Sequence, residues 1–475
     1  MENNDSNNTW KWILVLAVIA GLGFMTFFAG FGAGFGTGRV TSPQIASLKD
    51  MPFERTGPEG MNLPRITANS DLPREFDLLW EAWDALNEDF YGELPETPEM
   101  VGALVTGMLR AAEYEQDESL DLEDTSDDIL EAVVETLEQQ FGTLPEPSPL
   151  IYGAINGVTF ALEDDYTFLR NPEQAEFFNE GLNGSFEGIG ARVDTAEDGG
   201  VLIVEPFEGQ PAWEAGIRRD DIILAVDDVD VTDMSLQDAI QLIRGPKGSK
   251  VVLLVRSPEQ ESREITVKRD RISIPAVEYE MLDNNIAYIR LGEFSTPSTR
   301  QLRDALDELQ EQEPVGLILD LRGNPGGFLR TAVDISSEFI EDGPILVERF
   351  SDGEEQVYEA SGNGRALDIP LVVLVNEASA SASEILAGAI QDTSRGVLAG
   401  ETTFGKGSVQ VPHELSDGSM LSVTTARWFT PADQQIHGAG LVPDIQVERS
   451  LEDRAEDRDP QLEKAIEYLL ENFGQ

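Results

Sequence analysis

The sequence of 475 residues contains no cysteine, and it has only two histidines, His413 and His437. The lack of cysteine excludes disulfides, thiolate metal sites and a cysteine nucleophile. Neither histidine stands in a pattern of acidic residues typical of a metal site, so any hydrolytic chemistry is expected to need no metal or other cofactor. The lack of cysteine does not determine the cellular compartment, because secreted proteins can also lack cysteine.

Positive charge is also scarce. The chain has 33 Lys and Arg against 89 Asp and Glu, which gives a formal net charge of −56 and a pI near 4.1. Such a surface repels nucleic acid and anionic lipid headgroups, so neither is an expected partner. Only seven of the basic residues are lysine. An acidic, lysine-poor surface indicates a salty habitat in which ions screen self-repulsion, with a merely very soluble acidic protein as the alternative.

One long uncharged segment lies near the start of the chain, at residues 12–38. At about 1.5 Å per residue it is long enough to cross a bilayer as a helix. It exceeds the apolar run of a signal peptide, so an uncleaved anchor is favoured over a cleaved signal. Lys11 and Arg39 flank it with equal charge and leave its orientation open. Residues 1–11 are a short flank, and the proline-rich residues 39–75 are expected to form a linker.

Beyond the linker, the hydrophobic pattern changes three times and predicts a multidomain α/β protein. Residues 76–183 show helical spacing, and the acidic stretch 113–131 within them is expected to be a solvated helix or loop rather than a calcium site. Residues 184–271 form short apolar runs separated by Gly and Pro, which predict a small β-rich domain. Residues 272–449 alternate buried strands with helices, typical of an α/β core, and residues 450–475 predict a short docking helix.

Within the α/β core, the stretch VLVNEASASASEILAGAI places three serines where a strand leads into a helix. Unpaired N–H groups at a helix start can stabilise an oxyanion, so a serine there is well placed for acyl transfer. Serine also simply caps helices, and Ser383, directly before Glu384 and the apolar run, is predicted to be such a cap. Ser379 and Ser381 complete the set.

Lys406 makes the catalytic interpretation stronger. It lies between two glycines in TFGKGSVQ and has no carboxylate within four residues. Burial would lower its pKa and leave a neutral amine able to take a proton from a serine, as in Ser–Lys dyads. Gln410 could hold that amine in place. A phosphate-binding loop is excluded because G-x-x-x-x-G-K is absent.

The stretch LDLRGNPGG predicts a strand followed by a glycine turn that bares backbone N–H groups. An N–H from this turn, at Gly326 or Gly327, would form a two-donor oxyanion hole together with that of Ala382.

From residue 151 onward the chain resembles the carboxyl-terminal processing proteases, the tail-specific serine peptidases of bacteria and chloroplasts. The resemblance rests on GSFEGIGARV, PAWEAGIRRDDIILAVDD, IRGPKGSKVVLLVRS, LDLRGNPGG, SASASEILAGAIQD, TFGKGSVQ, TTARWFTP and GLVPD. It implies a PDZ domain at 184–271 and a crotonase-like α/β protease core at 272–449. It further implies the roles of nucleophile for Ser381, general base for Lys406, positioner for Gln410, and binding of a substrate's C-terminal carboxylate by Gly188, Ile189 and Gly190.

Some positions depart from the family pattern. Arg219-Asp220-Asp221 stands where Gly-Asp is favoured, and Asp228 replaces a turn glycine. Aspartate can adopt left-handed conformations, so the same turns are expected. Asp433-Gln434 replaces Gly-Arg, which leaves the substrate contacts there in doubt.

The function predicted is that of a membrane-anchored, single-pass serine endopeptidase with its catalytic domain on the extracytoplasmic side. Its expected partners are protein or peptide substrates with free apolar C-termini and, through the N-terminal helix, the membrane. The expanded region before residue 151 is expected to serve homo-oligomerisation or gating. The alternatives are a catalytically inactive PDZ scaffold tethered to the membrane and a ligand-binding module on the same fold.

Overall fold

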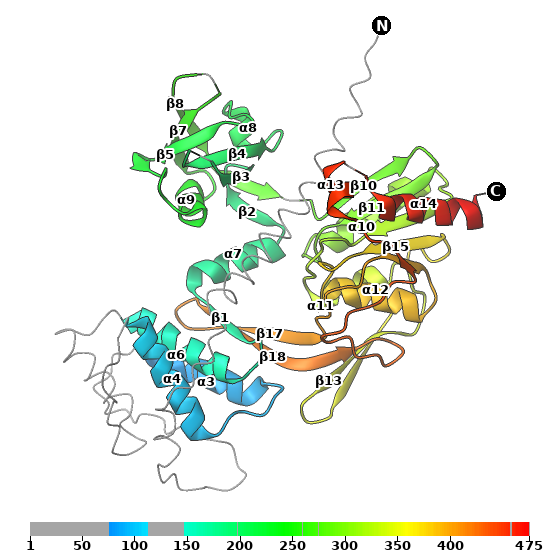
Figure 1. Cartoon of the computed structure of the whole chain (residues 1–475), viewed down its shortest axis with the longest axis horizontal. Helices are drawn as coiled ribbons and strands as arrows, with labels where there is room; N and C mark the ends of the chain where they lie inside the picture. The colour runs from blue at the N-terminus through cyan, green and yellow to red at the C-terminus, as the bar shows by residue number, and fades with distance from the viewer. Residues whose placement is uncertain are drawn as a thin grey trace, which may run out of the picture. The chain divides into compact units, whose positions relative to one another are not determined.

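The computed structural model describes residues 76–112, 147–196, 198–258, 260–273, 275–456 and 458–474. The anchor and linker predicted at 12–75 and the acidic stretch 113–131 lie outside these residues. Among the residues described, no helix combines the length and the apolarity needed to span a bilayer. The chain forms two compact units (Figure 1): residues 179–276 with 295–297 make the smaller, and the remaining described residues make the larger.

A six-stranded sheet forms the centre of the larger unit, in the order β10-β11-β12-β15-β16-β19. Every neighbouring pair is parallel except β10 with β11. The two central strands read GLILD and LVVLV and are buried throughout, as expected for a parallel sheet covered on both faces. The strands are β10 (Val277–Leu282), β11 (Ile286–Leu291), β12 (Gly316–Asp320), β15 (Leu371–Val375), β16 (Val397–Gly400) and β19 (Ile445–Gln446).

Helices cover both faces of this sheet, because successive strand residues point to opposite sides. Leu319 and Val373 belong to a core shared with α10, α11 and α12, whereas Ile318 and Val372 pack with Leu469 of α14. Figure 1 shows β15 between α12 and α14. The helices of this part are α10 (Ser298–Gln310), α11 (Leu329–Ser336), α12 (Ala382–Asp392), α13 (Leu451–Ala455) and α14 (Pro460–Phe473).

A second sheet joins the helical N-terminal region to the core. Its order is β1-β18-β13-β14, and β17 also pairs with β18. The apolar faces of α3, α4 and α6 pack against Leu169 of β1 and against Leu421 and Val423 of β18. The elements are α3 (Asp77–Asp89), α4 (Thr97–Ala111), α6 (Pro147–Ala161), β1 (Phe168–Arg170), β13 (Pro344–Phe350), β14 (Glu355–Glu359), β17 (Ser408–Glu414) and β18 (Met420–Phe429), and α7 (Pro172–Leu182) leads into the smaller unit.

The smaller unit contains a sheet in the order β3-β4-β5-β7-β8, with β6 beside β5, and a separate pair of β2 and β9. Its own apolar core includes Ile203, Ile223 and Leu253. Asp220 and Asp228 have φ of 66° and 68°, which confirms that aspartate supplies the left-handed turns. The elements are β2 (Ser185–Gly188), β3 (Ala191–Thr195), β4 (Val201–Pro206), α8 (Pro211–Glu214), β5 (Ile222–Val226), β6 (Val229–Asp230), α9 (Leu236–Ile243), β7 (Lys250–Arg256), β8 (Arg263–Lys268) and β9 (Asp270–Ser273).

Candidate active site

Three loops leave the same edge of the parallel sheet and bring the predicted catalytic residues together. β12 ends at Asp320 and leads into the glycine turn, β15 ends at Val375 and leads to Ser381, and β16 ends at Gly400 and leads to Lys406. The carboxyl ends of parallel strands lie at one edge of a sheet, where ligand sites of α/β folds are usually found.

Ser381 has an unusual backbone conformation, with φ 55° and ψ −113°, directly before α12. A non-glycine residue with positive φ is uncommon, and such strain persists only where the surroundings hold it. The conformation places Ser381 at a sharp turn from strand to helix, and its side chain is partly exposed. This is the arrangement that presents a nucleophile at the mouth of an α/β site.

The other two serines hold the turn in place. Ser379 and Ser383 are fully buried, and their hydroxyls donate to the carbonyl oxygens of Leu321 (2.8 Å) and Asn324 (2.9 Å) on the glycine turn. The prediction that Ser383 caps the helix is wrong. The N-cap of α12 is Ser381, two residues earlier, because the Ser383 hydroxyl is occupied by the neighbouring loop.

Glu384 is a residue that sequence reasoning missed. It is completely buried on the first turn of α12. Its Oε2 accepts hydrogen bonds from the backbone N–H of Ser381 (2.8 Å) and Lys406 (2.9 Å). Its Oε1 accepts from the Gly405 N–H (2.7 Å) and the Thr403 hydroxyl (2.6 Å). Burial raises the pKa of Glu384, and these four donors act in the opposite direction. The S-x-x-E spacing of a capping box could have indicated this role.

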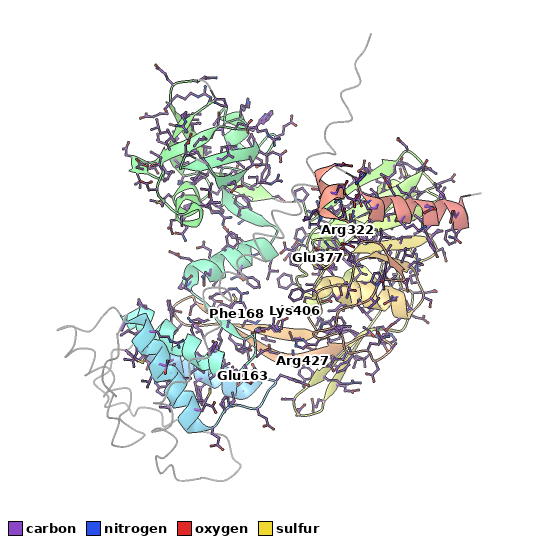
Figure 2. All side chains as sticks on the ribbon, in the orientation of Figure 1. Glu163, Phe168, Arg322, Glu377, Lys406 and Arg427 are labelled. Atoms are coloured by element: carbon purple, nitrogen blue, oxygen red, sulfur yellow. The ribbon has the colours of Figure 1, made fainter. Side chains whose placement is uncertain are left out.

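The amine of Lys406 lies over an aromatic ring. The Lys406 Nζ lies 5.2 Å from the centre of the Tyr166 ring, and the Lys406 carbonyl oxygen accepts from the indole N–H of Trp428 at 3.0 Å. Burial lowers the pKa of Lys406 to about 8, and the positive charge of Arg170 adds to the same effect. Figure 2 shows Lys406 just before β17, with Arg427 on the neighbouring strand β18.

Gln410 lies on β17 beside β18. Its Nε2 donates to the hydroxyl of the buried Thr424 at 3.2 Å, which leaves the amide oxygen available to a second partner. Within the described residues, no side-chain hydrogen bond joins Ser381, Lys406 and Gln410 directly. Catalytic hydrogen bonds are often long in an unliganded enzyme and tighten when substrate binds.

The glycine turn lies directly against Ser381. A Cβ added to Gly326 would approach the Cβ of Ser381 at 2.9 Å and the N of Ala382 at 3.0 Å. The N–H of Gly326 itself donates to Asn324 Oδ1 at 2.9 Å. Gly327 pairs with Phe294 in a parallel β-bridge. The hydrogen bonds of this bridge are made by the carbonyl oxygen of Gly326 and the N–H of Phe328, so the N–H of Gly327 faces away from Phe294.

A buried ion-pair network links this glycine turn to the end of β12 and to the start of α14. Arg322 donates to Asp320 at 2.6 Å and to Asp459, the N-cap of α14, at 2.8 Å. Both aspartates hold the guanidinium, and their charges raise the pKa of Arg322 against the effect of burial. The glycine turn is therefore fixed to two separate elements of the core.

The three residues predicted to bind a peptide's C-terminus lie in the smaller unit, at the end of β2 and in the turn that leads to the edge strand β3. Ile189 is buried in the core, and Gly190 has a φ of 74°. The carbonyl oxygens of Ile189 and Gly190 accept from the N–H groups of Ala212 (2.7 Å) and Phe207 (3.0 Å). The turn thus directs its carbonyl groups inward, immediately before an edge strand.

Comparison with known proteins extends over both units. Residues 285–447 match the model of peptidase family S41, and residues 203–257 match that of a PDZ domain. The carboxy-terminal processing protease CtpA of Bacillus subtilis is 40% identical over 326 residues, 68% of this chain and 70% of that protein. The carboxyl-terminal-processing protease of Synechocystis is 40% identical over 327 residues, 67% of this chain and 76% of that protein. A solved photosystem II D1 C-terminal processing protease aligns at 29% identity with a TM-score of 0.46, over 80% of this chain and 95% of its own.

Proposed function

The chain belongs to peptidase family S41 as a serine-type carboxyl-terminal processing protease with a PDZ domain, and from this membership we propose how its own residues perform the reaction. The predicted family and the predicted serine peptidase activity are confirmed. The assignment of individual residues, the route of the proton and the attachment to a membrane are the proposal.

In the proposed mechanism Ser381 is the nucleophile and Lys406 the general base. The neutral amine of Lys406 takes the proton from Ser381 Oγ as that oxygen attacks the carbonyl carbon of the scissile bond. When the tetrahedral intermediate collapses, the C–N bond breaks and the ammonium of Lys406 gives its proton to the leaving amine. Water, deprotonated by the same amine, then attacks the acyl carbon, the ester C–O bond to Ser381 breaks, and the ammonium returns the proton to Ser381 Oγ. The amide oxygen of Gln410 orients the Lys406 amine, since its Nε2 is committed to Thr424.

The oxyanion of the intermediate would accept hydrogen bonds from the backbone N–H groups of Gly327 and Ala382. Ala382 is the first residue of α12, so its N–H lacks an intrahelical partner. Gly326 contributes space rather than a donor, because its N–H is held by Asn324. Two such donors in a preorganised site lower the barrier to acyl transfer by several kcal/mol, about 3 for each donor.

The PDZ domain would select substrates by their C-termini. A peptide would pair with the edge strand β3 and place its carboxylate on the N–H groups of the turn Gly188-Ile189-Gly190, whose last two carbonyls are engaged inward. Holding the tail in this way raises the effective concentration of the chain at the dyad. Cleavage would therefore depend on a free apolar C-terminus more than on the scissile sequence.

One observation carries the dyad assignment: a single carboxylate oxygen of Glu384 accepts from the backbone of both Ser381 and Lys406. The test compares the full chain with Ser381→Ala and Lys406→Ala on an unfolded reporter that ends in a free apolar C-terminus, beside its amidated twin. We expect cleavage to vanish in both variants and to weaken on amidation. Cleavage by Ser381→Ala would refute the choice of nucleophile, and inactivity of the wild type at every salt concentration would favour the scaffold alternative.

We also propose that residues 12–38 anchor the enzyme in the cell membrane, with the protease on the extracytoplasmic side. The support is the uncharged length of this segment in the sequence. A protease-accessibility assay on intact cells and on inverted vesicles tests both statements. Recovery of the chain in the soluble fraction without its residues 1–38 would instead indicate a cleaved signal.

A further inference from the structure

Arg170, the last residue of β1, places its guanidinium over the rings of two aromatic side chains. The guanidinium carbon lies 4.3 Å from the centre of the Phe168 ring and 4.0 Å from that of Phe178. Nη1 donates to the hydroxyl of Ser422 on β18 at 2.6 Å. A contact with the face of an aromatic ring uses none of the N–H donors of a guanidinium in a conventional hydrogen bond, so these donors remain for other partners.

This cation has no carboxylate partner among the residues that the structure describes, although the chain has 89 acidic residues. Arg322, the buried arginine of the glycine turn, is paired with two aspartates. Burial lowers the pKa of Arg170 to about 10, so the side chain stays protonated at neutral pH. A guanidinium has five N–H donors, and the contact to Ser422 uses one of them.

The position of Arg170 is that of a residue of the active site. Ser422 and Thr424 are two residues apart on β18 and share one face of the sheet, about 7 Å apart. Thr424 is bound by Gln410, and Ser422 by Arg170. Arg170 is also the charge with the largest effect on the Lys406 amine, ahead of Glu384 and Asp164.

We propose that Arg170 is a carboxylate-binding subsite beside the dyad, which selects peptides by an anionic group close to the scissile bond. The guanidinium edge matches a carboxylate in bidentate geometry, and the two rings hold it in that orientation before the peptide arrives. The carboxylate comes from an Asp or Glu side chain or from the peptide's own C-terminus. The inference rests on the proposed dyad and adds a substrate preference to it.

The test measures binding rather than turnover, so that it does not depend on the dyad being active. The full chain with Ser381→Ala is titrated with fluorescent peptides of one sequence, in which a single Glu is moved through the positions around the cleaved bond, each beside its Gln twin. All peptides keep the same C-terminus, which holds the PDZ contribution constant. We expect Glu at one position to raise the affinity roughly tenfold, as for a charge-assisted hydrogen bond, and the double variant Ser381→Ala/Arg170→Gln to lose this difference.

A second arm, with each peptide as free acid and as amide, identifies the source of the carboxylate. A loss of affinity on amidation that disappears with Arg170→Gln assigns the C-terminal group to Arg170, whereas a loss that remains belongs to the PDZ domain. Equal affinities for every Glu and Gln pair, together with an amidation effect that Arg170→Gln leaves unchanged, overturn the proposal.

The controls separate a local role from a general effect of charge. Arg458→Gln removes one positive charge at a half-exposed position paired with Asp453 and Glu456, and it should leave the Glu preference intact. Arg170→Lys keeps the charge without the planar edge and should retain less than half of the preference. Thermal melting reports whether the Arg170→Gln variant is folded. If it is not, the difference in affinity between the Glu and Gln peptides for Ser381→Ala, which keeps Arg170, still tests the preference. Cleavage of the neutral twin by the wild-type chain tests the proposed dyad separately.

Discussion

Glu384 and Lys406 are joined by a hydrogen bond from the Lys406 backbone N–H to Glu384 Oε2, at 2.9 Å. The same oxygen accepts from the N–H of Ser381, so one buried carboxylate fixes the loop of the proposed base to the turn of the proposed nucleophile. Neither loop belongs to a regular element at this point, and each depends on side-chain contacts for its position.

We therefore expect Glu384→Gln to impair catalysis more than binding. The amide would direct an NH₂ group toward backbone N–H donors, and unsatisfied buried donors of this kind cost about 1–3 kcal/mol each. kcat should fall at least tenfold with a small change in KM, and the melting temperature should fall as well. Glu377→Gln, an exposed Glu to Gln exchange in the loop between β15 and α12, is the matched control. It should leave both kcat and the melting temperature unchanged. Unchanged kcat in Glu384→Gln would show that the two loops hold their positions without this carboxylate.

The pH dependence of the reaction should follow the Lys406 amine. Burial lowers the pKa of Lys406 to about 8, and the base must be neutral to accept the serine proton. At pH 7 roughly a tenth of the molecules then have the neutral amine. The measured kcat/KM should rise with pH through about 8 and level off above it. A profile that is flat between pH 6 and 9 would exclude Lys406 as the titrating base.

Two charged neighbours should move this profile in opposite directions. Arg170 lowers the pKa of Lys406, whereas Asp164 and Glu384 raise it. Arg170→Met should therefore shift the acidic limb of kcat/KM to higher pH, and Asp164→Asn should shift it to lower pH, each by about half a unit at low salt. A neutral substrate keeps the comparison independent of carboxylate binding. Shifts of the same sign in both variants would contradict this electrostatic assignment.

The space beside Ser381 should depend on Gly326. Alanine there would bring its Cβ to 2.9 Å from Ser381 Cβ in a backbone with φ of 109°. We expect Gly326→Ala to lose more than a hundredfold in kcat/KM, because the turn must move away from Ser381 and from the proposed oxyanion donor at Ala382. Gly343→Ala is the control: its φ is 90°, and an added Cβ meets no atom within 4 Å. That variant carries a similar backbone cost of about 1–2 kcal/mol but should keep its activity.

The sequence predicted the parts of the site that local chemistry determines. The strand-to-turn pattern, the glycines and the isolated lysine can each be interpreted from the roughly ten residues around them. The choice between Ser381 and Ser383 as the helix cap was not determined locally, because it depends on a hydrogen bond to Asn324 in another loop. Arg170 was overlooked for the same reason, since it reaches Ser422 through pairing of strands 252 residues apart.

Tail recognition should depend on the turn before β3, and a glycine pair in the smaller unit can test this. Gly190 has a φ of 74°, and a Cβ there would lie 2.6 Å from the Cβ of Gln210, whereas Gly209, with a φ of 72°, has free space around it. Gly190→Ala should therefore displace the turn whose N–H groups we propose for the carboxylate, and weaken binding of a free apolar C-terminus at least tenfold. Gly209→Ala should bind the same peptide as the wild type does, although it carries the same backbone cost of a positive φ. Calorimetric titration with the acid and the amide measures both effects. If both variants bind alike, the carboxylate is held elsewhere than at this turn.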